Sequence, residues 1–129
     1  MRRIRSRDTG PECLVRRLLT SMGYRYRLNV RDLPGTPDIV FRRRKLAIFV
    51  HGCFWHRHRC RFGRVVPRTR REFWLEKFAA NTARDRKALR LLKTEGWTVL
   101  TVWECQLSNE AKMRARLGQF LAGAILPLS

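Results

Sequence analysis

The chain has 129 residues, 44% of them hydrophobic, and a formal net charge of +19 at pH 7. This length and hydrophobic content predict a single domain over residues 1–129 with one core. Arginine supplies 24 of the 29 basic residues, and its forked guanidinium suits phosphate, so the charge predicts a polyanionic partner such as nucleic acid. A ribosomal-type protein, or arginine bias in the genome, is the alternative explanation for this composition.

Membrane and secreted proteins do not fit this sequence. No hydrophobic run approaches the roughly 20 residues that a membrane-spanning helix needs. The segment from Met1 to Arg7 carries charges without the apolar stretch of a signal peptide. We therefore expect an intracellular, cytoplasmic protein, in which cysteines are metal ligands or core residues more often than disulfides.

The beginning of the chain has the pattern of a helix followed by a strand. Thr9 and Glu12 have the spacing of a capping box, a helical stripe of leucines follows, and Gly23 ends the predicted helix. Apolar and basic residues then alternate from Tyr24 to Val30, which predicts a half-buried strand.

Two more strands are expected on either side of a basic turn. A turn cluster at residues 33–37 precedes a strand at 38–41, and four basic residues at 42–45 form the predicted end of a hairpin. The run 46–50 shows little alternation with polar residues, so we expect it to be a central strand.

A long helical region is predicted next. Thr69 and Glu72 repeat the capping-box spacing and predict a helix over residues 70–78. A second helix, or a bent continuation of the first, is expected over residues 81–95.

The chain is expected to end on a strand and a helix. Gly96 stops the preceding helix, and a strand follows at residues 98–103. Ser108 or Asn109 caps a last helix that runs through Leu121. The order α-β-β-β-loop-α-β-α predicts an α/β fold.

A metal-binding loop is predicted at about residues 51–67, directly after the central strand. Its first ten residues contain all three histidines of the chain and two of its four cysteines. Thiolate and neutral imidazole are ligands of tetrahedral zinc, so the clustering favours zinc over four unrelated thiols. Cys105, at the end of a predicted strand, is favoured as fourth ligand over Cys13, which lies beside the buried helical stripe. The loop itself would supply three ligands: Cys53, His58 and Cys60.

Two histidines remain outside the predicted zinc site, His51 and His56. Histidine titrates near neutral pH and serves as a general base, although a lone histidine is more often structural. Asp38 opens a strand near the end of the central strand, where a carboxylate suits Mg²⁺, and a turn-capping aspartate is the common alternative. Glu12 and Asp85 are weaker candidates, because both are expected on helices, where a salt bridge or a cap is the usual role.

Phe54 and Trp55 are two aromatic residues inside the metal loop. We expect them to be exposed and able to enter a base stack. Packing within the zinc loop is the alternative for one of them.

Several segments resemble the very-short-patch repair (Vsr) DNA mismatch endonucleases, from about Met1 to Cys105 and weakly into the last helix. The most specific are His51-Gly52-Cys53-Phe54-Trp55-His56 and Trp103-Glu104-Cys105. The others are Pro37-Asp38, Phe73-Trp74-Leu75-Glu76-Lys77, Asn81, Arg84-Asp85-Arg86 and Gly96-Trp97. This resemblance implies a single restriction-endonuclease-like, PD-(D/E)xK domain with a central mixed β-sheet flanked by helices and a structural zinc loop.

The resemblance also implies two metal sites. Asp38 and the main-chain carbonyl of Val50 would bind catalytic Mg²⁺, and Glu12 would hold metal-bound water. Structural Zn²⁺ would be bound by Cys53, His58, Cys60 and Cys105.

By the same resemblance, His56 would activate water or assist at the phosphate, oriented by Asp85, and His51 would lie beside the metal ions. Phe54 and Trp55 would insert next to the mismatch. Further DNA contacts are expected from an N-terminal arm with Arg2, Arg3, Arg5 and Arg7.

The implied activity is Mg²⁺-dependent nicking of one DNA strand beside a T:G mismatch, which arises when 5-methylcytosine deaminates. Unstacking costs a few kcal/mol per base step, and a mismatch lowers that cost. We expect a nucleoid-associated monomer acting on double-stranded DNA, and functional coupling to a DNA cytosine methyltransferase and mismatch-repair proteins is a further hypothesis. The alternatives are a zinc-stabilised basic nucleic-acid-binding protein without cleavage activity, and a same-fold nuclease with a different target site.

Overall fold

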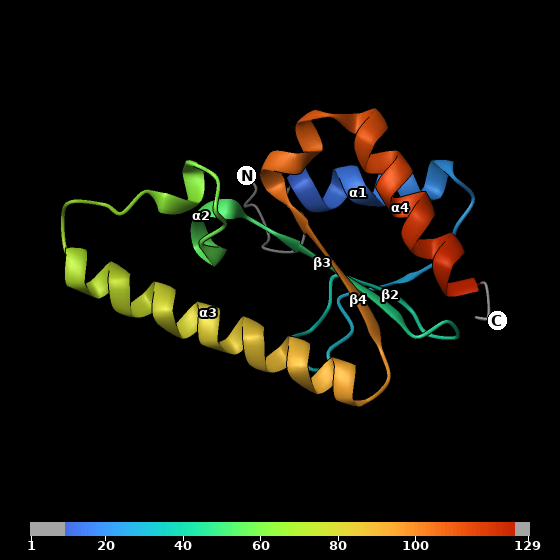
Figure 1. The fold of residues 1–129 in the computed structure, drawn as a ribbon, viewed down its shortest axis with the longest axis horizontal. Helices are drawn as coiled ribbons and strands as arrows, with labels where there is room; N and C mark the ends of the chain where they lie inside the picture. The colour runs from blue at the N-terminus through green and yellow to red at the C-terminus, as the bar shows by residue number, and fades with distance from the viewer. Residues whose placement is uncertain (1–9, 126–129) are drawn as a thin grey trace, which may run out of the picture.

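The computed structural model describes residues 10–125, and within them four strands form one mixed sheet in the order β1-β2-β3-β4 (Figure 1). The strands are β1 (Arg27–Leu28), β2 (Ile39–Phe41), β3 (Leu46–His51) and β4 (Thr98–Trp103). The pairs β1–β2 and β2–β3 are antiparallel, whereas β3 and β4 run parallel. A parallel pair needs a long crossover, and here residues 52–97 provide it.

Helices cover both faces of this sheet (Figure 1). α1 (Gly10–Ser21) and α4 (Glu110–Ile125) lie on one face, and α3 (Arg71–Thr94) packs on the other through its C-terminal part. The predicted α/β fold, with a central mixed sheet flanked by helices, is therefore confirmed.

Alternate residues of β3 face the two helical layers. Leu46 and Ile48 pack with residues of α1 and α4, whereas Ala47 and Phe49 pack with Leu92 of α3. These four residues of β3 are at most 8% exposed. Because both faces are covered, the strand is apolar along its length, as expected for a strand inside the sheet.

The predicted strand over residues 24–30 is shorter than expected, because only the two residues of β1 pair with β2. Tyr24 and Tyr26 instead place their rings edge-on against Phe41, with centroids 6.2 Å apart in each pair. Asn29 adopts a left-handed φ of 47°, which interrupts the extended backbone. The alternating pattern thus reflects the packing of two tyrosines rather than a long ladder.

α3 is one continuous helix of 24 residues, although the sequence predicted two helices or a bent one. Ala79 and Ala80 join the two predicted segments, and alanine is the strongest helix former, so nothing there ends the helix. The capping box predicted at Thr69 and Glu72 is wrong. Arg70 occupies the N-cap with a left-handed φ of 57° and makes no side-chain cap hydrogen bond.

The start of α4 agrees with one of its two predicted caps. Asn109 Oδ1 accepts a hydrogen bond from the Lys112 backbone N–H at 3.0 Å. The helix then continues past its predicted end at Leu121 to Ile125.

Three short helical turns lie at the same end of the sheet. α2 (Cys53–His56) and the 3₁₀ turn η2 (Phe62–Arg64) lie within the predicted metal loop, and η3 (Glu104–Ser108) follows β4. Between residues 10 and 125, no helix is both long and apolar enough to cross a membrane. The predicted cap Thr9 and the predicted DNA contacts Arg2, Arg3, Arg5 and Arg7 lie outside the described residues.

Candidate functional site

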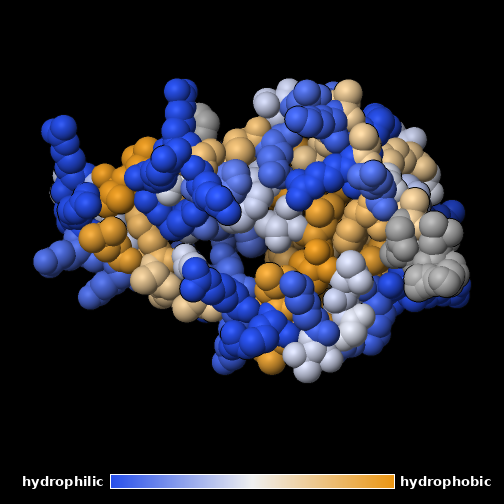
Figure 2. Space-filling model, in the orientation of Figure 1, coloured by the Kyte–Doolittle hydropathy of each residue, from blue (hydrophilic) through white to orange (hydrophobic). Residues whose placement is uncertain are grey.

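A cavity of about 1290 Å³ opens where β3 and β4 end, between the sheet and α3. Figure 2 shows the surface hollowed between α3 and the body of the molecule. α1, β3, α2, α3 and β4 all contribute to its wall. The structure brings five residues predicted as catalytic into this wall: Glu12, Asp38, His51, His56 and Asp85.

His56 and Asp85 form a short polar contact in this cavity. His56 lies at the end of α2, Asp85 lies on α3, and His56 Nδ1 is 2.6 Å from Asp85 Oδ2. An ionised carboxylate only accepts hydrogen bonds, so the imidazole donates through Nδ1, and in the neutral form of the ring the lone pair is then on Nε2. This tautomer is the one that a general base requires.

His51, the last residue of β3, stacks directly on His56. Their ring centroids are 3.8 Å apart and their planes differ by 4°. Burial, and secondly the neighbouring His56, lower the pKa of His51 to about 4, so His51 is neutral near pH 7. Its Nδ1 is buried and has no hydrogen-bond partner within the described residues.

The stacking argues against one metal ion bound jointly by these groups. The ligand atoms of His51, His56 and Asp85 do lie within 4.8 Å of one another. However, imidazole nitrogens bind metals in the plane of the ring, and two parallel stacked rings direct their lone pairs along parallel planes. The arrangement therefore fits a hydrogen-bonded general base beside a second imidazole better than a chelate.

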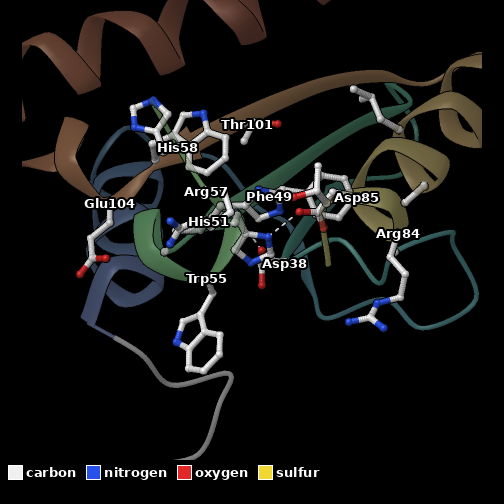
Figure 3. A pocket seen from close by; sticks show the side chains of 18 of the residues that line it. Asp38, Phe49, His51, Trp55, Arg57, His58, Arg84, Asp85, Thr101 and Glu104 are labelled. Atoms are coloured by element: carbon white, nitrogen blue, oxygen red, sulfur yellow. Dashed lines mark hydrogen bonds and ion pairs between the residues drawn. The ribbon is translucent and has the colours of Figure 1, made fainter. Parts of the chain in front are cut away.

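Asp38 lies immediately before β2 and faces the end of β3. Its Oδ2 accepts a hydrogen bond from the Val50 backbone N–H at 2.7 Å, and Figure 3 shows its side chain beside His51. Burial raises the pKa of Asp38, against the lowering effect of the Val50 hydrogen bond. A partly buried carboxylate beside a strand end supplies the oxygen ligand that Mg²⁺ prefers, so the donors present fit this ion.

Glu12 differs from the expectation for a helix-surface carboxylate. It lies in the first turn of α1 but is only 2% exposed, and it lines the same cavity as Asp38. The fold therefore moves it from a weak candidate to a residue inside the site. Its burial depends on how α1 packs against the sheet, which its sequence neighbours do not reveal.

A separate cluster is formed by Cys53, His58, Cys60 and Cys105, whose ligand atoms lie within 4.8 Å of one another. His58 Nδ1 is 3.8 Å from Cys53 Sγ and 3.5 Å from Cys105 Sγ. Tetrahedral zinc places neighbouring sulfur and nitrogen ligands roughly 3.5–3.8 Å apart. The four residues thus fit a structural metal such as zinc, with three ligands from one loop and the fourth from the end of β4.

The thiols support the same conclusion. Burial, and after it the neighbouring thiols of Cys60 and Cys105, raise the pKa of Cys53 to about 12. Packing several protonated thiols together has no obvious benefit, whereas a bound zinc ion would keep them as thiolates.

The two aromatic residues of α2 have different surroundings. Trp55 is 44% exposed, and Figure 3 shows it directed away from His51 and Asp38. Phe54 is half-buried, with its ring edge-on to Phe78 at 5.1 Å. Trp55 is therefore exposed as predicted, whereas Phe54 packs against α3 rather than only within the zinc loop.

Arg57 was not identified from the sequence as a residue of the site. Its guanidinium lies 3.9 Å from the ring centroid of Phe78 and donates hydrogen bonds to the carbonyls of Val65 at 2.7 Å and Phe54 at 3.2 Å. Burial lowers the pKa of Arg57. Within residues 10–125, Arg16 and Arg116 are half-buried as well, and no local pattern distinguishes Arg57 from the other arginines. Its backbone adopts a left-handed φ of 55°.

Comparison with known proteins identifies the family of this chain. A family model described as DNA mismatch endonuclease Vsr matches residues 1–62. The chain is 52% identical over 121 residues to a type II nicking enzyme, V.XorIIP, of Xanthomonas oryzae pv. oryzae, covering 94% of this chain and 88% of the relative. A second nicking enzyme, V.NmeAIP of Neisseria meningitidis, is 44% identical over 121 residues, 94% of this chain and 86% of the relative.

The DNA mismatch endonuclease Vsr of Escherichia coli is 47% identical over 113 residues, which cover 88% of this chain and 72% of the relative. The chain therefore belongs to the Vsr family and is a DNA nicking endonuclease, a hydrolase of phosphodiester bonds.

Proposed function

We propose that this endonuclease cuts one strand of double-stranded DNA in the cavity between β3 and α3, with His56 as general base and Mg²⁺ as cofactor. The observation that carries the proposal is the 2.6 Å contact between His56 Nδ1 and Asp85 Oδ2, in the cavity that also contains Asp38. This contact orients one imidazole and fixes its tautomer.

Asp85, His56 and His51 would have different roles in the reaction. Asp85 holds the His56 ring, and the Nε2 lone pair takes a proton from water as the water oxygen attacks phosphorus and the P–O bond breaks. His51 supports the His56 ring by stacking at 3.8 Å, and being neutral it can hydrogen-bond a phosphate oxygen or water.

The Mg²⁺ site would be formed by Asp38 and the main-chain carbonyl of Val50, with Glu12 orienting water nearby. When bound, Mg²⁺ stabilises the charge that develops on the phosphate oxygens. The hydrogen bond from the Val50 N–H fixes one carboxylate oxygen of Asp38. The side chain thereby acquires a defined orientation before any ion binds.

A T:G mismatch is the proposed target, and the exposed Trp55 supports it. An aromatic side chain enters a base stack at lower cost where the bases are already poorly stacked. The positive charge and the proposed arm residues Arg2, Arg3, Arg5 and Arg7 would supply phosphate contacts. One copy suffices for such an asymmetric lesion, so a nucleoid-associated monomer, coupled to a cytosine methyltransferase and mismatch-repair proteins, completes the proposal.

A same-fold nuclease with a different target site is the competing proposal. The names of the Xanthomonas and Neisseria relatives, type II nicking enzymes, favour it more directly than they favour a T:G pair. The remaining alternative, a zinc-stabilised nucleic-acid-binding protein without cleavage activity, is not supported, because the chain belongs to an endonuclease family.

A nicking assay tests these proposals. One labelled duplex with a central T:G mismatch is compared with the matched C:G duplex and with an unmodified plasmid, in Mg²⁺ or in EDTA. Strand-specific cleavage of the mismatched duplex alone supports the T:G target. Equal nicking of the matched DNA at a fixed sequence contradicts it and supports the alternative target.

Active-site variants test the residue roles in the same assay. Asp38→Asn and His56→Ala are expected to abolish nicking while the fold and DNA binding remain. Asp32→Asn is the matched control, because Asp32 pairs with Arg42 at an exposed position outside the cavity. Full activity of either active-site variant, with Mg²⁺ present, would contradict its assigned role.

A further inference from the structure

Trp103 lies between the metal cluster and the catalytic histidines. It is the last residue of β4, lines the cavity, and is two residues before the cluster member Cys105. In the parallel register, Trp103 pairs with His51 of β3, so the two side chains emerge side by side at the same end of the sheet.

On the metal side, the indole of Trp103 stacks on His58. The ring centroids are 4.4 Å apart and the planes differ by 20°. His58 Nδ1 faces the sulfur atoms of Cys53 and Cys105 at 3.8 and 3.5 Å. If His58 and the three cysteines hold a zinc ion, that ion would restrict the orientation of the His58 ring, against which the indole packs.

On the catalytic side, the same indole lies edge-on to both imidazoles of the stacked pair. Its centroid is 5.2 Å from that of His51, at an interplanar angle of 71°, and 6.4 Å from that of His56, at 68°. Edge-to-face aromatic contacts of this kind have a preferred geometry. Any tilt of the indole therefore changes the contact surface of His51 and, through the stack, of His56.

The main chain at Trp103 is held independently of the metal. Its backbone N–H donates to Gln106 Oε1 at 3.0 Å, and the same oxygen accepts a hydrogen bond from Arg116 at 2.7 Å. The indole ring is thus the part of Trp103 that contacts both His58 and His51. Close packing on both sides leaves the ring few alternative positions.

We propose that Trp103 is a positioning residue that couples metal occupancy of the Cys53/His58/Cys60/Cys105 cluster to the alignment of His51 and His56. The metal cluster then does more than hold the loop together: it sets the geometry of the general base. This inference rests on the proposed function, in which the two histidines act at the phosphate.

The activity test compares Trp103→Leu and Trp103→Phe with the matched control Trp97→Phe. Trp97 is 7% exposed, precedes β4, and belongs to the core cluster on the α3 face, away from the histidines. Trp103→Leu should retain full zinc content and the KM for DNA but lose kcat by about tenfold to hundredfold, the size expected for misplacing a catalytic group by about 1 Å. Trp103→Phe should recover part of the loss, and Trp97→Phe should nick normally.

A second readout does not depend on activity. The chain has three histidines, so their ring signals can be assigned by NMR with single substitutions. Exchange of Zn²⁺ for the larger Cd²⁺ should shift the signals of His51 and His56 in the unmutated protein and in Trp97→Phe. In Trp103→Leu only His58 should respond. If that variant does not fold, Trp103→Phe should show a reduced response at His51 and His56.

The outcomes separate this inference from the proposed function. If the unmutated protein does not nick, or His56→Ala nicks normally, the proposed function fails. If both behave as expected but the folded Trp103 variants keep wild-type kcat, or their His51 and His56 signals still follow the metal exchange, the coupling is wrong.

Discussion

The two ends of α3 belong to regions that are stabilised in different ways. Its C-terminal part packs Ala88 and Leu92 against the sheet, where Phe49 is also buried. Its N-terminal part leaves Phe73 and Leu75 at 40% and 43% exposure, beside the α2 loop (Figure 1). The sheet region has a continuous apolar core, whereas the loop region depends on a metal cluster and a few aromatic and arginine contacts.

The proposed catalytic groups are distributed across this division. His51 ends β3 and Asp38 immediately precedes β2, whereas His56 belongs to the loop region and contacts Asp85 on α3. The proposed general base therefore depends on the packing of the loop against α3. Substitutions in the two regions should accordingly separate losses of stability from losses of chemistry.

Among the substitutions that compare these two regions, Asp85→Asn should have the largest effect. The amide keeps the shape of the side chain but can donate toward His56 Nδ1, which favours the wrong tautomer. We expect kcat for nicking to fall by about 10²–10⁴-fold, the usual contribution of a positioned general base. Single-turnover nicking measures this, and denaturant unfolding should show the same stability as the unmutated chain.

Leu117→Ala should lower the stability of the protein without lowering kcat, the opposite of Asp85→Asn. Leu117 on α4 is 0% exposed and belongs to the core on the α1 face, far from the loop region in sequence. Truncation should lower the free energy of unfolding by about 2–5 kcal/mol. At a temperature where the variant remains folded, its kcat should match that of the unmutated protein. A large loss of kcat in the folded variant would show that core and catalytic site are not separable.

Arg57→Met tests the loop region. The substitution keeps a flexible apolar stem over Phe78 but removes the donors to the Val65 and Phe54 carbonyls. We expect a loss of roughly 2 kcal/mol in unfolding free energy at constant Zn²⁺, because two hydrogen bonds to a charged donor and a cation–π contact disappear. Arg59→Met, on an exposed neighbour, is the matched control. If both variants have the same free energy of unfolding, the hydrogen bonds of Arg57 do not stabilise the loop.

The sequence revealed those parts of this arrangement that are local. The apolar run of β3, the loop that follows it, and the clustering of Cys53, His58 and Cys60 are all visible within about twenty residues. Cys105 could be chosen because a predicted strand ended just before it. The structure brings these four residues together, and the family membership agrees with the resemblance seen in the short motifs.

The parts that could not be predicted depend on long-range packing. The contact of Trp103 with His51 follows from the parallel register of β3 and β4, whose strands are separated by a long crossover. The burial of Glu12 follows from the position of α1 on the sheet. The continuity of α3 is different, because Ala79 and Ala80 favour a helix locally and are visible in the sequence. A local sequence pattern contains neither the register of two strands nor the position of a helix on a sheet. The Trp103 contact and the burial of Glu12 could therefore be recognised only from the fold.

Of the substitutions discussed, Trp55→Ala should have the smallest effect. It also allows Trp55 to be compared with Phe54, the other aromatic residue of α2. Trp55 is exposed, so its truncation should leave the free energy of unfolding nearly unchanged while weakening binding to T:G DNA by about 1 kcal/mol, roughly fivefold. Phe54→Ala should instead destabilise the protein, because Phe54 packs on Phe78. Binding titrations on mismatched and matched duplexes measure the first effect, and denaturant unfolding measures the second. If Trp55→Ala weakens binding to both duplexes equally, the side chain contacts DNA without sensing the mismatch, and the T:G target loses its main structural support.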